Sequence, residues 1–396
     1  MMRIGVLTFH NTVNFGAQLQ TLATQEMLRK LGYEPVVVNY RDKGKLDALK
    51  KMHGEEQRVV HERFAESYFN LSPPLDTTEE VGEYCRTQLD GVVSGSDAVF
   101  RLGAPYQPYR LAKRLLGRKN PFEAFSWSDR LPPFYLPFET PGVIKGSIAA
   151  SSRGTPFYFM KPHMIRDAGN ALADFDFVTV RDDWTGKLVS WLSRDRAKPL
   201  YSPDPVFGLN SAFTVPDHEK PDIDLSDVIL VNGDFEEEWL RRLVDAIRAR
   251  GYRVMTLANP DETESVDFTD GTLDLPMSPL RWYACLASCA GFVGMRFHAF
   301  VSCMANKTPV VTVDVTKKRW GKADGRNPNN DLARRTGILD RYFHRDDLMA
   351  TDAETILDRL FDPVTQERAN AYVDAAPEIL FGHLRRFEQL ASSARS

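Results

Sequence analysis

The sequence predicts an α/β protein of two Rossmann-like, doubly wound domains that face a cleft, followed by C-terminal helices. Its 396 residues exceed the ~250–300 residues at which a single hydrophobic core stops growing. Short apolar runs alternate with amphipathic helical runs from residue 3 onward, and this alternation starts again after a polar, proline-containing stretch. We therefore expect an N-terminal domain at 1–209, a linker at 210–226 and a C-terminal domain at 227–396.

The N-terminal domain opens with a strand, a loop, a helix and a second strand. The sequence predicts a buried parallel strand over 3–8, a helix over 17–31 that Gly32 ends, and a strand over 35–40. In a doubly wound sheet, ligands lie beyond the carboxyl ends of the strands. We therefore expect the polar loop 9–16 to face the cleft.

The rest of this domain continues the alternation. Residues 41–89 are mostly helical in pattern, and the next short strand ends at Gly95, Ser96 and Asp97. The segment 101–140 is rich in Pro, Arg and aromatic residues without a clear period, so we expect an extended excursion over the cleft rather than a core element. Three further strands are predicted, with helices between them, in VIKGSIAASS, FDFVTVRDD and KPLYSPDPVFGL.

The C-terminal domain repeats the pattern. Four strands are predicted in VILVNG, YRVMTLA, GFVGMR and TPVVTVD, with helices over 235–250, 279–288 and 298–306. The last forty residues are helical in pattern. Two such domains facing one another give a glycosyltransferase-B-like outline, in which the terminal helix returns to brace the first domain.

The composition limits the class of partner. The chain is 43% hydrophobic and 26% charged, which is typical of a globular protein and excludes a disordered one. Its formal net charge of −4 gives no general attraction for nucleic acid or anionic lipid. We expect no nucleic-acid partner and at most a peripheral membrane contact, because no run approaches the ~20 apolar residues that span a bilayer. The N-terminus lacks the apolar stretch of a signal peptide, so a cytoplasmic location is expected.

The strongest candidate for chemistry is the pair Arg296 and His298, where an apolar strand gives way to a helix. A helix N-terminus carries partial positive charge, and a planar guanidinium binds a carboxylate or phosphate through two bonds. His298 carries a proton near neutral pH, and the neighbouring guanidinium is expected to disfavour its charged form until an anion binds. A packed His beside an Arg paired with a nearby Asp is the structural alternative.

Five motifs in order carry a family resemblance. They are NTVNFGAQLQTLATQEMLRKLGYEP, VVSGSD, the AASS that precedes FDFVTVRDD, SPDPVF and RFH. Over residues 3 to about 313 the chain resembles the polysaccharide pyruvyl transferases. The resemblance implies transfer of the pyruvyl group of phosphoenolpyruvate to a sugar or lipid-linked glycan, with a ketal formed and phosphate released, as in exopolysaccharide biosynthesis. Phosphoenolpyruvate is then the donor substrate, and no cofactor is expected.

The resemblance and the chemistry together suggest roles on the donor side. We assign His298 as the acid that protonates the methylene carbon of the donor and Arg296 as a ligand of its anionic groups. Arg181 and Arg153 are further donor-binding candidates, with a structural ion pair as the alternative for Arg181 and plain solvation for Arg153. Asp97 is a candidate base toward a sugar hydroxyl, with helix capping as its alternative.

Other positions are expected on the acceptor side or in its loop, namely Asn14, Gly16, Gln18 and Ser96. A helix cap is the alternative for Asn14 and a turn glycine for Gly16. The sequence SSRG departs from the Ser-Phe-Gly that many relatives carry, which leaves the donor in question.

Several features have a simpler explanation. Trp127, Tyr106 and Tyr109 either stack on sugars or pack their loop onto the core. The basic run 317–322 is either a solvated loop or a phosphate-binding segment. We expect Cys285 and Cys289 to pack rather than bind zinc, and no metal is predicted. Asp204 is expected in a structural turn.

Two other functions stay open. A glycosyltransferase with a nucleotide-sugar donor would keep the same fold, and a catalytically silent binding protein would explain the altered SSRG segment. The sequence leaves the oligomeric state, the acceptor sugar and the linkage undefined.

Overall fold

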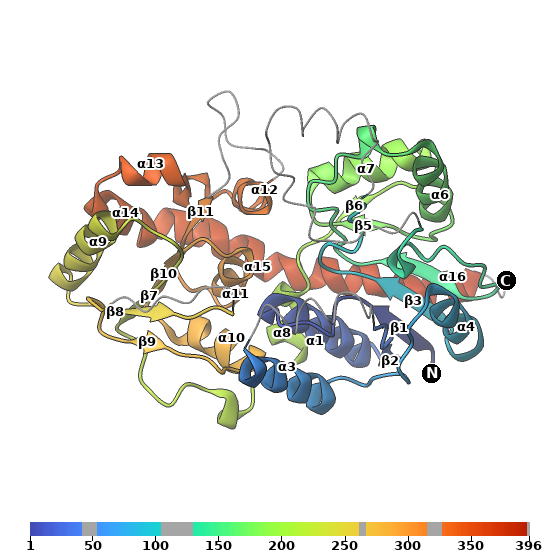
Figure 1. Ribbon diagram of the computed structural model, residues 1–396, viewed down its shortest axis with the longest axis horizontal. Helices are drawn as coiled ribbons and strands as arrows, with labels where there is room; N and C mark the ends of the chain where they lie inside the picture. The colour runs from blue at the N-terminus through green and yellow to red at the C-terminus, as the bar shows by residue number, and fades with distance from the viewer. Residues whose placement is uncertain (42–53, 104–129, 261–266, 315–326, 394–396) are drawn as a thin grey trace.

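The computed structural model describes residues 1–41, 54–103, 130–260, 267–314 and 327–393. It contains two parallel β-sheets that lie side by side with helices between and around them (Figure 1). We call the part around the sheet of β1 the first lobe and the part around the sheet of β7 the second lobe. The division of the chain into domains at 209 and 226 stays a prediction.

The first sheet has the order β2-β1-β3-β4, all parallel. Its strands are β1 Arg3–Leu7, β2 Glu34–Val37, β3 Gly91–Ser94 and β4 Ile144–Ser147. The short pair β5 Thr179–Val180 and β6 Leu200–Tyr201 continues beside β4 through isolated bridges, of which Ala150 to Val180 is one. The predicted strands thus exist, although each is shorter than its apolar run.

Helices cover this sheet on both sides. Helix α1 is capped by Asn14, and Gly32 follows it in the left-handed region at φ +84°. All residues from Phe15 to Leu28 are buried, because α1 lies between the sheet and the second lobe. The helices of this lobe are α1 Phe15–Lys30, α3 Glu55–Tyr68, α4 Thr78–Gln88, α6 Pro162–Ala173 and α7 Asp183–Ser193.

Two predictions for the first lobe are wrong. The end of the excursion at 130–140 contributes to the core, because the 3-10 turn η1 Pro133–Tyr135 is buried and the Tyr135 hydroxyl donates to the Phe100 carbonyl at 2.8 Å. The second half of KPLYSPDPVFGL forms helix α8 Val206–Ala212 rather than a strand. Asp204 starts that helix, since its Oδ1 accepts from the backbone N–H of Val206 at 3.1 Å.

The second sheet has the order β12-β11-β10-β7-β8-β9, also all parallel. Its strands are β7 Val228–Asn232, β8 Arg253–Leu257, β9 Thr272–Leu273, β10 Gly291–Gly294, β11 Val310–Asp314 and β12 Tyr342–His344. Its helices are α9 Glu237–Ala249, α10 Pro279–Ser288, α11 Phe297–Ala305, α12 Pro328–Arg335, α13 Arg345–Met349 and α14 Ala353–Leu360. The short strand β12 was not predicted from the sequence.

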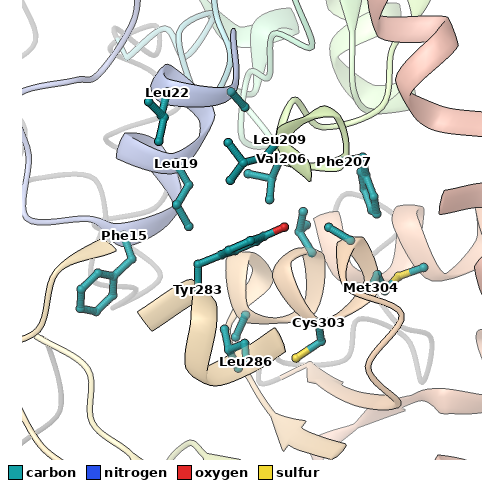
Figure 2. Packing of buried hydrophobic residues seen from close by; sticks show 14 of the residues in the cluster. Phe15, Leu19, Leu22, Val206, Phe207, Leu209, Tyr283, Leu286, Cys303 and Met304 are labelled. Atoms are coloured by element: carbon teal, nitrogen blue, oxygen red, sulfur yellow. The ribbon is translucent and has the colours of Figure 1, made fainter. Parts of the chain in front are cut away.

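One hydrophobic cluster joins the two lobes. Helices α1 and α8 of the first lobe pack against α10 and α11 of the second (Figure 2). The buried residues that Figure 2 shows at this junction are Phe15, Leu19, Leu22, Val206, Phe207, Leu209, Tyr283, Leu286, Cys303 and Met304. Because apolar surface gains free energy when it is removed from water, this junction favours one arrangement of the lobes.

The C-terminal helices connect the lobes a second time. Helix α15 Pro363–Leu384 runs from the second lobe to the first, and α16 Arg386–Ser393 packs beside β4 (Figure 1). Phe387 is fully buried there against the rings of Tyr33 and Phe177. The predicted return of the terminal helix to the first sheet is confirmed. None of the helices in the described part of the chain has the length and apolar character needed to cross a bilayer.

Candidate functional site

The two sheets each have a point where the chain leaves neighbouring strands in opposite directions. In the first sheet this point lies between β1 and β3, and in the second between β7 and β10. Ligands of doubly wound sheets bind where such loops diverge. Ser96 and Asp97 follow β3, and Arg296 and His298 follow β10, so the predicted residues of both lobes stand at these points.

Arg296 lies at the start of helix α11. Strand β10 ends at Gly294, Arg296 has extended backbone angles, and its carbonyl accepts the first helical hydrogen bond from Phe300 at 3.1 Å. The predicted order of strand, turn and helix is therefore confirmed. The helix runs over nine residues, so its first N–H groups add partial positive charge beside the half-buried guanidinium.

His298 touches the first lobe at Gly16. A Cβ atom at Gly16 would lie 1.9 Å from Cγ and 2.2 Å from Nδ1 of His298, so only glycine leaves room for the imidazole. The group that lies against Gly16 is therefore the imidazole of the other lobe, and the acceptor-side role predicted for Gly16 stays a prediction. The Nε2 atom of His298 is buried and has no hydrogen-bond partner among the described residues. A buried nitrogen without a partner costs free energy, so this atom calls for an explanation.

Arg181 ties the two lobes together on the polar side. Its Nη1 donates to Oδ2 of Asp204 at 3.0 Å, and its Nη2 lies 3.6 Å from Oδ1 of Asp97. The guanidinium also lies over the ring of Phe297, 4.8 Å from its centroid. The Arg181 side chain is 9% exposed, and that of Asp204 is 2% exposed. The structural ion pair considered for Arg181 is thus present, and its role toward the donor stays a prediction.

The surroundings of His298 keep its imidazole neutral. Burial lowers the pKa of His298 below its usual 6.5, while the negative charges of Asp97 and Asp204 oppose this and the positive charges of Arg181 and Arg153 add to it. The sequence attributed the lowered pKa to the neighbouring Arg296. That attribution is corrected, because the chief cause is desolvation and the contributing guanidinium groups belong to the first lobe.

Asp97 is held in its ionised form. Burial alone would raise the pKa of its carboxyl, but Arg181, His298, Arg153 and the backbone N–H of Ala98 together lower it. Asp97 has φ 68°, and no helix follows it within residues 98–103, so the helix-cap alternative is wrong. A carboxylate with a lowered pKa accepts hydrogen bonds well and protons poorly.

The positive charge of Arg153 acts on a second cation of the first lobe, Arg101, which was not predicted from the sequence. The segments that carry these two residues are joined by backbone hydrogen bonds. The N–H of Ser151 donates to the Asp97 carbonyl at 2.9 Å, and the N–H of Phe100 donates to the Ser151 carbonyl at 3.0 Å. Burial, with the positive charge of Arg153, lowers the pKa of Arg101 to about 10. Two guanidinium groups therefore lie near each other at the carboxyl end of the first sheet. Arg101 directly follows the strand-end motif, which was the available signal.

The predicted acceptor-side residues have mixed positions. Asn14 is exposed and caps α1 by accepting from the Ala17 N–H at 3.1 Å, so the cap alternative is confirmed. Gln18 is buried and donates to the carbonyls of His10 and His61, both at 3.1 Å. Its amide is used within the fold, which does not support the role predicted for it. Ser96 is buried, and its carbonyl accepts from the Thr8 hydroxyl at 3.1 Å.

Asp204 and Gln20 extend the polar cluster. The amide of Gln20 donates to Oδ2 of Asp204 at 2.5 Å, and the backbone N–H of Phe207 donates to the Asp204 carbonyl at 3.0 Å. The turn predicted at Asp204 is confirmed, and the same carboxylate also neutralises Arg181. Neither Gln20 nor Phe297 had a sequence signal, because their partners are far away in the chain.

Some predicted features lie elsewhere. Trp127, Tyr106, Tyr109 and the basic run 317–322 lie outside the described residues. Cys285 and Cys289 pack in the hydrophobic core, where burial raises the pKa of Cys285 to about 11 and that of Cys289 to about 12. Across the described ranges, no group of three or more His, Cys, Asp and Glu side chains is arranged to hold a metal ion.

Comparison with known proteins adds two findings. The sequence profile described as polysaccharide pyruvyl transferase matches residues 14–316. The glycosyltransferase SnogD from Streptomyces nogalater superposes with a TM-score of 0.50 at 12% identity, covering 98% of this chain and 99% of that one. UGT89C1 from Arabidopsis thaliana, in complex with UDP-L-rhamnose, gives 0.50 at 10% identity, covering 99% and 98%. At this identity the likeness concerns the fold alone, and it confirms the glycosyltransferase-B-like arrangement. Comparison with curated protein sequences gives no match.

Proposed function

This chain belongs to the polysaccharide pyruvyl transferase family, and on that premise we propose that it moves the pyruvyl group of phosphoenolpyruvate onto sugar hydroxyls of a glycan or glycan precursor. The product is a pyruvate ketal, and phosphate is released. The observation that carries this proposal is the buried Nε2 of His298, which has no hydrogen-bond partner in the described part of the chain and follows strand β10 close to Arg296. The imidazole supplies the acid, and the guanidinium a ligand for the donor's anionic groups.

The proposed reaction balances without a cofactor. The imidazolium of His298 gives its proton to the methylene carbon of the donor, which becomes a methyl group, and the adjacent carbon becomes electrophilic. One sugar hydroxyl oxygen bonds to that carbon, the bond to phosphate breaks, and a second hydroxyl completes the ketal. Of the two hydroxyl protons, one restores the imidazolium and the other leaves with the phosphate.

The charges around His298 favour this order of events. In the free protein the lowered pKa keeps the imidazole neutral. The carboxylate and phosphate of the donor bring negative charge next to it, which raises the imidazole pKa and charges the acid only when the donor is bound. Once its proton has been given up, the neutral imidazole is also the stronger proton acceptor for a hydroxyl, because the carboxyl of Asp97 has a lowered pKa. We therefore propose that Asp97 orients a sugar hydroxyl rather than deprotonating it.

The cations divide into two groups. Arg181 is neutralised by Asp204 and Asp97, so its chief effect is to hold those carboxylates and the ring of Phe297 in place. Arg153 makes no ion pair with any described residue, and Arg101 lies beside it. We propose that Arg296, Arg153 and Arg101 provide the positive charge that binds the donor, which stabilises the departing phosphate.

We propose a cytoplasmic location as well. The four cysteines are free thiols, which fits a reducing compartment. The acceptor, whether soluble or lipid-linked, would then be met on the cytoplasmic side.

The test is phosphate release from phosphoenolpyruvate in the presence of oligosaccharide acceptors, with wild-type protein and His298→Gln. We expect acceptor-dependent release that falls by about 10²–10⁴-fold in the variant, the usual contribution of a positioned acid. Thermal shift with phosphoenolpyruvate and UDP-glucose separates the donors, because a ligand at ~100 times its dissociation constant adds ~2.7 kcal/mol of stability. Stabilisation by UDP-glucose alone, with no phosphate release, would instead identify a glycosyltransferase.

A further inference from the structure

An exposed aromatic surface lies on the first lobe next to the site. Tyr158 is 52% exposed and Trp191 is 41% exposed, although large aromatic side chains are usually buried. The ring centroids of these two residues are 5.3 Å apart, and Tyr158 lies 6.4 Å from Trp184. Fully buried Phe157 lies beneath all three, with centroid distances of 4.1, 5.2 and 5.6 Å to Tyr158, Trp184 and Trp191. We call these three residues, Tyr158, Trp184 and Trp191, the aromatic platform.

The platform is anchored to the loop that carries Arg153. The indole N–H of Trp184 donates to the Thr155 carbonyl at 2.9 Å, and the Thr155 hydroxyl donates to the Ser152 carbonyl at 2.7 Å. Tyr158 follows Arg153 by five residues, so their Cα atoms are within about 17 Å of each other. The platform is therefore anchored to the same loop as Arg153.

Helix α7 carries the platform away from the meeting point of the lobes. It starts at Asp183, directly after Arg181 and the capping residue Asp182, and the carboxylate of Asp183 pairs with Arg334 of α12 at 2.6 Å. Figure 1 shows α7 at the top of the first lobe, between α12 of the second lobe and α6. Trp184 and Trp191 are seven residues apart on one helix, which is a rise of about 10 Å. Their rings thus form an elongated surface rather than a single contact.

The chemistry of this surface suits a sugar chain. Tryptophan and tyrosine present a flat apolar face with a polar edge, which complements the C–H faces and hydroxyl rims of pyranose rings. A membrane surface is less well matched, because residues 157–200 contain seven Lys and Arg against six Asp. A near-neutral aromatic strip beside a proposed glycan-modifying site favours a neutral polar ligand with apolar faces.

We propose that the aromatic platform is an acceptor subsite that binds the glycan chain beyond the sugar that receives the pyruvyl group. The proposal rests on the proposed function and deepens it, since it makes the acceptor an oligosaccharide or a repeating unit instead of a monosaccharide. The loop from Ser152 to Phe157 then links donor binding at Arg153 to acceptor binding at Tyr158.

Direct binding tests the subsite apart from catalysis. The full-length chain is applied to a printed array of glucose-, galactose-, mannose- and N-acetylglucosamine-containing glycans of one to six sugars. We expect binding that grows from one to three or more sugars, and a drop of about tenfold in Trp191→Ala and in Tyr158→Ala, the loss of one stacked ring. Val364→Ala, which trims a 61% exposed side chain on α15, is the control and should bind like the wild type.

Three outcomes overturn the proposal: no array binding, array binding unchanged in both aromatic variants, or loss in those variants only of binding to phosphatidylglycerol vesicles. The melting temperature of each variant shows that it folds. Phosphate release from phosphoenolpyruvate distinguishes the two claims. Platform-dependent glycan binding without phosphate release would refute the proposed reaction alone, while phosphate release with platform variants indifferent to acceptor length would refute the subsite alone.

Discussion

The two lobes meet in two regions of opposite character. In the apolar region, Leu19 of α1 points toward Tyr283 of α10, and Met304 of α11 lies on the side of Phe207 of α8 (Figure 2). In the polar region, the first turn of α1 contacts the imidazole of His298 at Gly16. His298 belongs to α11, and the later residues of this helix also contribute to the apolar region. Helices α1 and α11 therefore contribute to both the junction and the candidate site, while α8 and α10 contribute to the junction.

The comparison explains how the charged groups are held. Burying charged groups costs free energy unless each is paired. Burying apolar surface stabilises the folded state but does not fix the orientation of individual side chains. The apolar region stabilises the junction of the lobes, and the ion pairs of Arg181 with its two carboxylates fix the orientation of the charged side chains. If this division is correct, a change at His298 alters chemistry, a change that removes Arg181 leaves buried carboxylates uncompensated, and changes in the apolar region alter stability alone.

The largest expected effect is that of His298→Gln, which should lower turnover by about 10²–10⁴-fold because the acid is removed. The free energy of unfolding should change little, since glutamine is close in size to histidine and keeps a polar group at this position. Steady-state kinetics and denaturant unfolding measure the two quantities. Leu19→Ala is the matched control in the apolar region, expected to cost ~2–5 kcal/mol of stability with turnover per folded molecule unchanged. Loss of stability without loss of turnover in His298→Gln, together with loss of turnover without loss of stability in Leu19→Ala, would contradict the division between the two regions.

Arg181→Met should destabilise the protein by ~3–5 kcal/mol, because it leaves the carboxylates of Asp204 and Asp97 buried without their cation. Urea unfolding measures this loss. The double variant Arg181→Met, Asp204→Asn should recover part of the stability, since one uncompensated charge is removed as well. Equal stability of the single variant and the wild type would show that the ion pair contributes nothing.

Gly16→Ala tests the contact between the lobes at the imidazole. The added Cβ would overlap His298, so the imidazole must move, and we expect turnover to fall about 10²-fold as for a misplacement of ~1 Å. Gly382→Ala, where an added Cβ meets no atom within 4 Å, is the matched control and should leave turnover unchanged. Donor affinity, measured by calorimetry, should be nearly unaffected in both. Full activity of Gly16→Ala would mean that the position of His298 is not fixed by this contact.

The pH dependence is the smallest and most specific effect. The pKa of His298 in the free protein lies below 6.5, so kcat/KM for the donor should rise as pH falls from 8 and level off only below 6.5. Asp97→Asn removes a charge that raises the His298 pKa and should move this inflection to lower pH. The free energy of unfolding depends on pH in the opposite sense. Because the pKa of His298 is lower in the folded chain, the unfolded chain binds more protons. The contribution of His298 to stability is therefore complete above pH 6.5 and is lost as pH falls through the folded pKa. A bell-shaped pH profile of kcat/KM centred above pH 7 would contradict the assignment of His298 as the acid.

The sequence predicted local features well and contacts between distant residues poorly. Apolar runs ending in polar groups located β3 and β10, because both the period and the strand-end position are local. The run VFGL looked like a strand, yet Asp204 accepts the N–H of Val206 and starts a helix. Tyr135 was assigned to a surface excursion, although its ring fills the core.

The candidate site shows the same limit. Arg296 and His298 were found because their turn lies between a strand and a helix. The contact of Gly16 with His298 and the ion pair of Arg181 with Asp204 join residues that are far apart in the chain, so no period or spacing in one sequence indicates them. Such pairs can be recognised only when the relative positions of the two lobes are known.

The most direct test of the central claim follows the proton itself. Phosphoenolpyruvate and an oligosaccharide acceptor are incubated with the protein in deuterated water, and the ketal methyl group is observed by NMR. If the imidazole of His298 delivers a solvent-exchanged proton to the methylene carbon, each methyl group carries one deuterium, and His298→Gln forms the same product at least ~10²-fold more slowly while still binding the donor. A product without deuterium in its methyl group, or an unchanged rate in His298→Gln, would contradict the account.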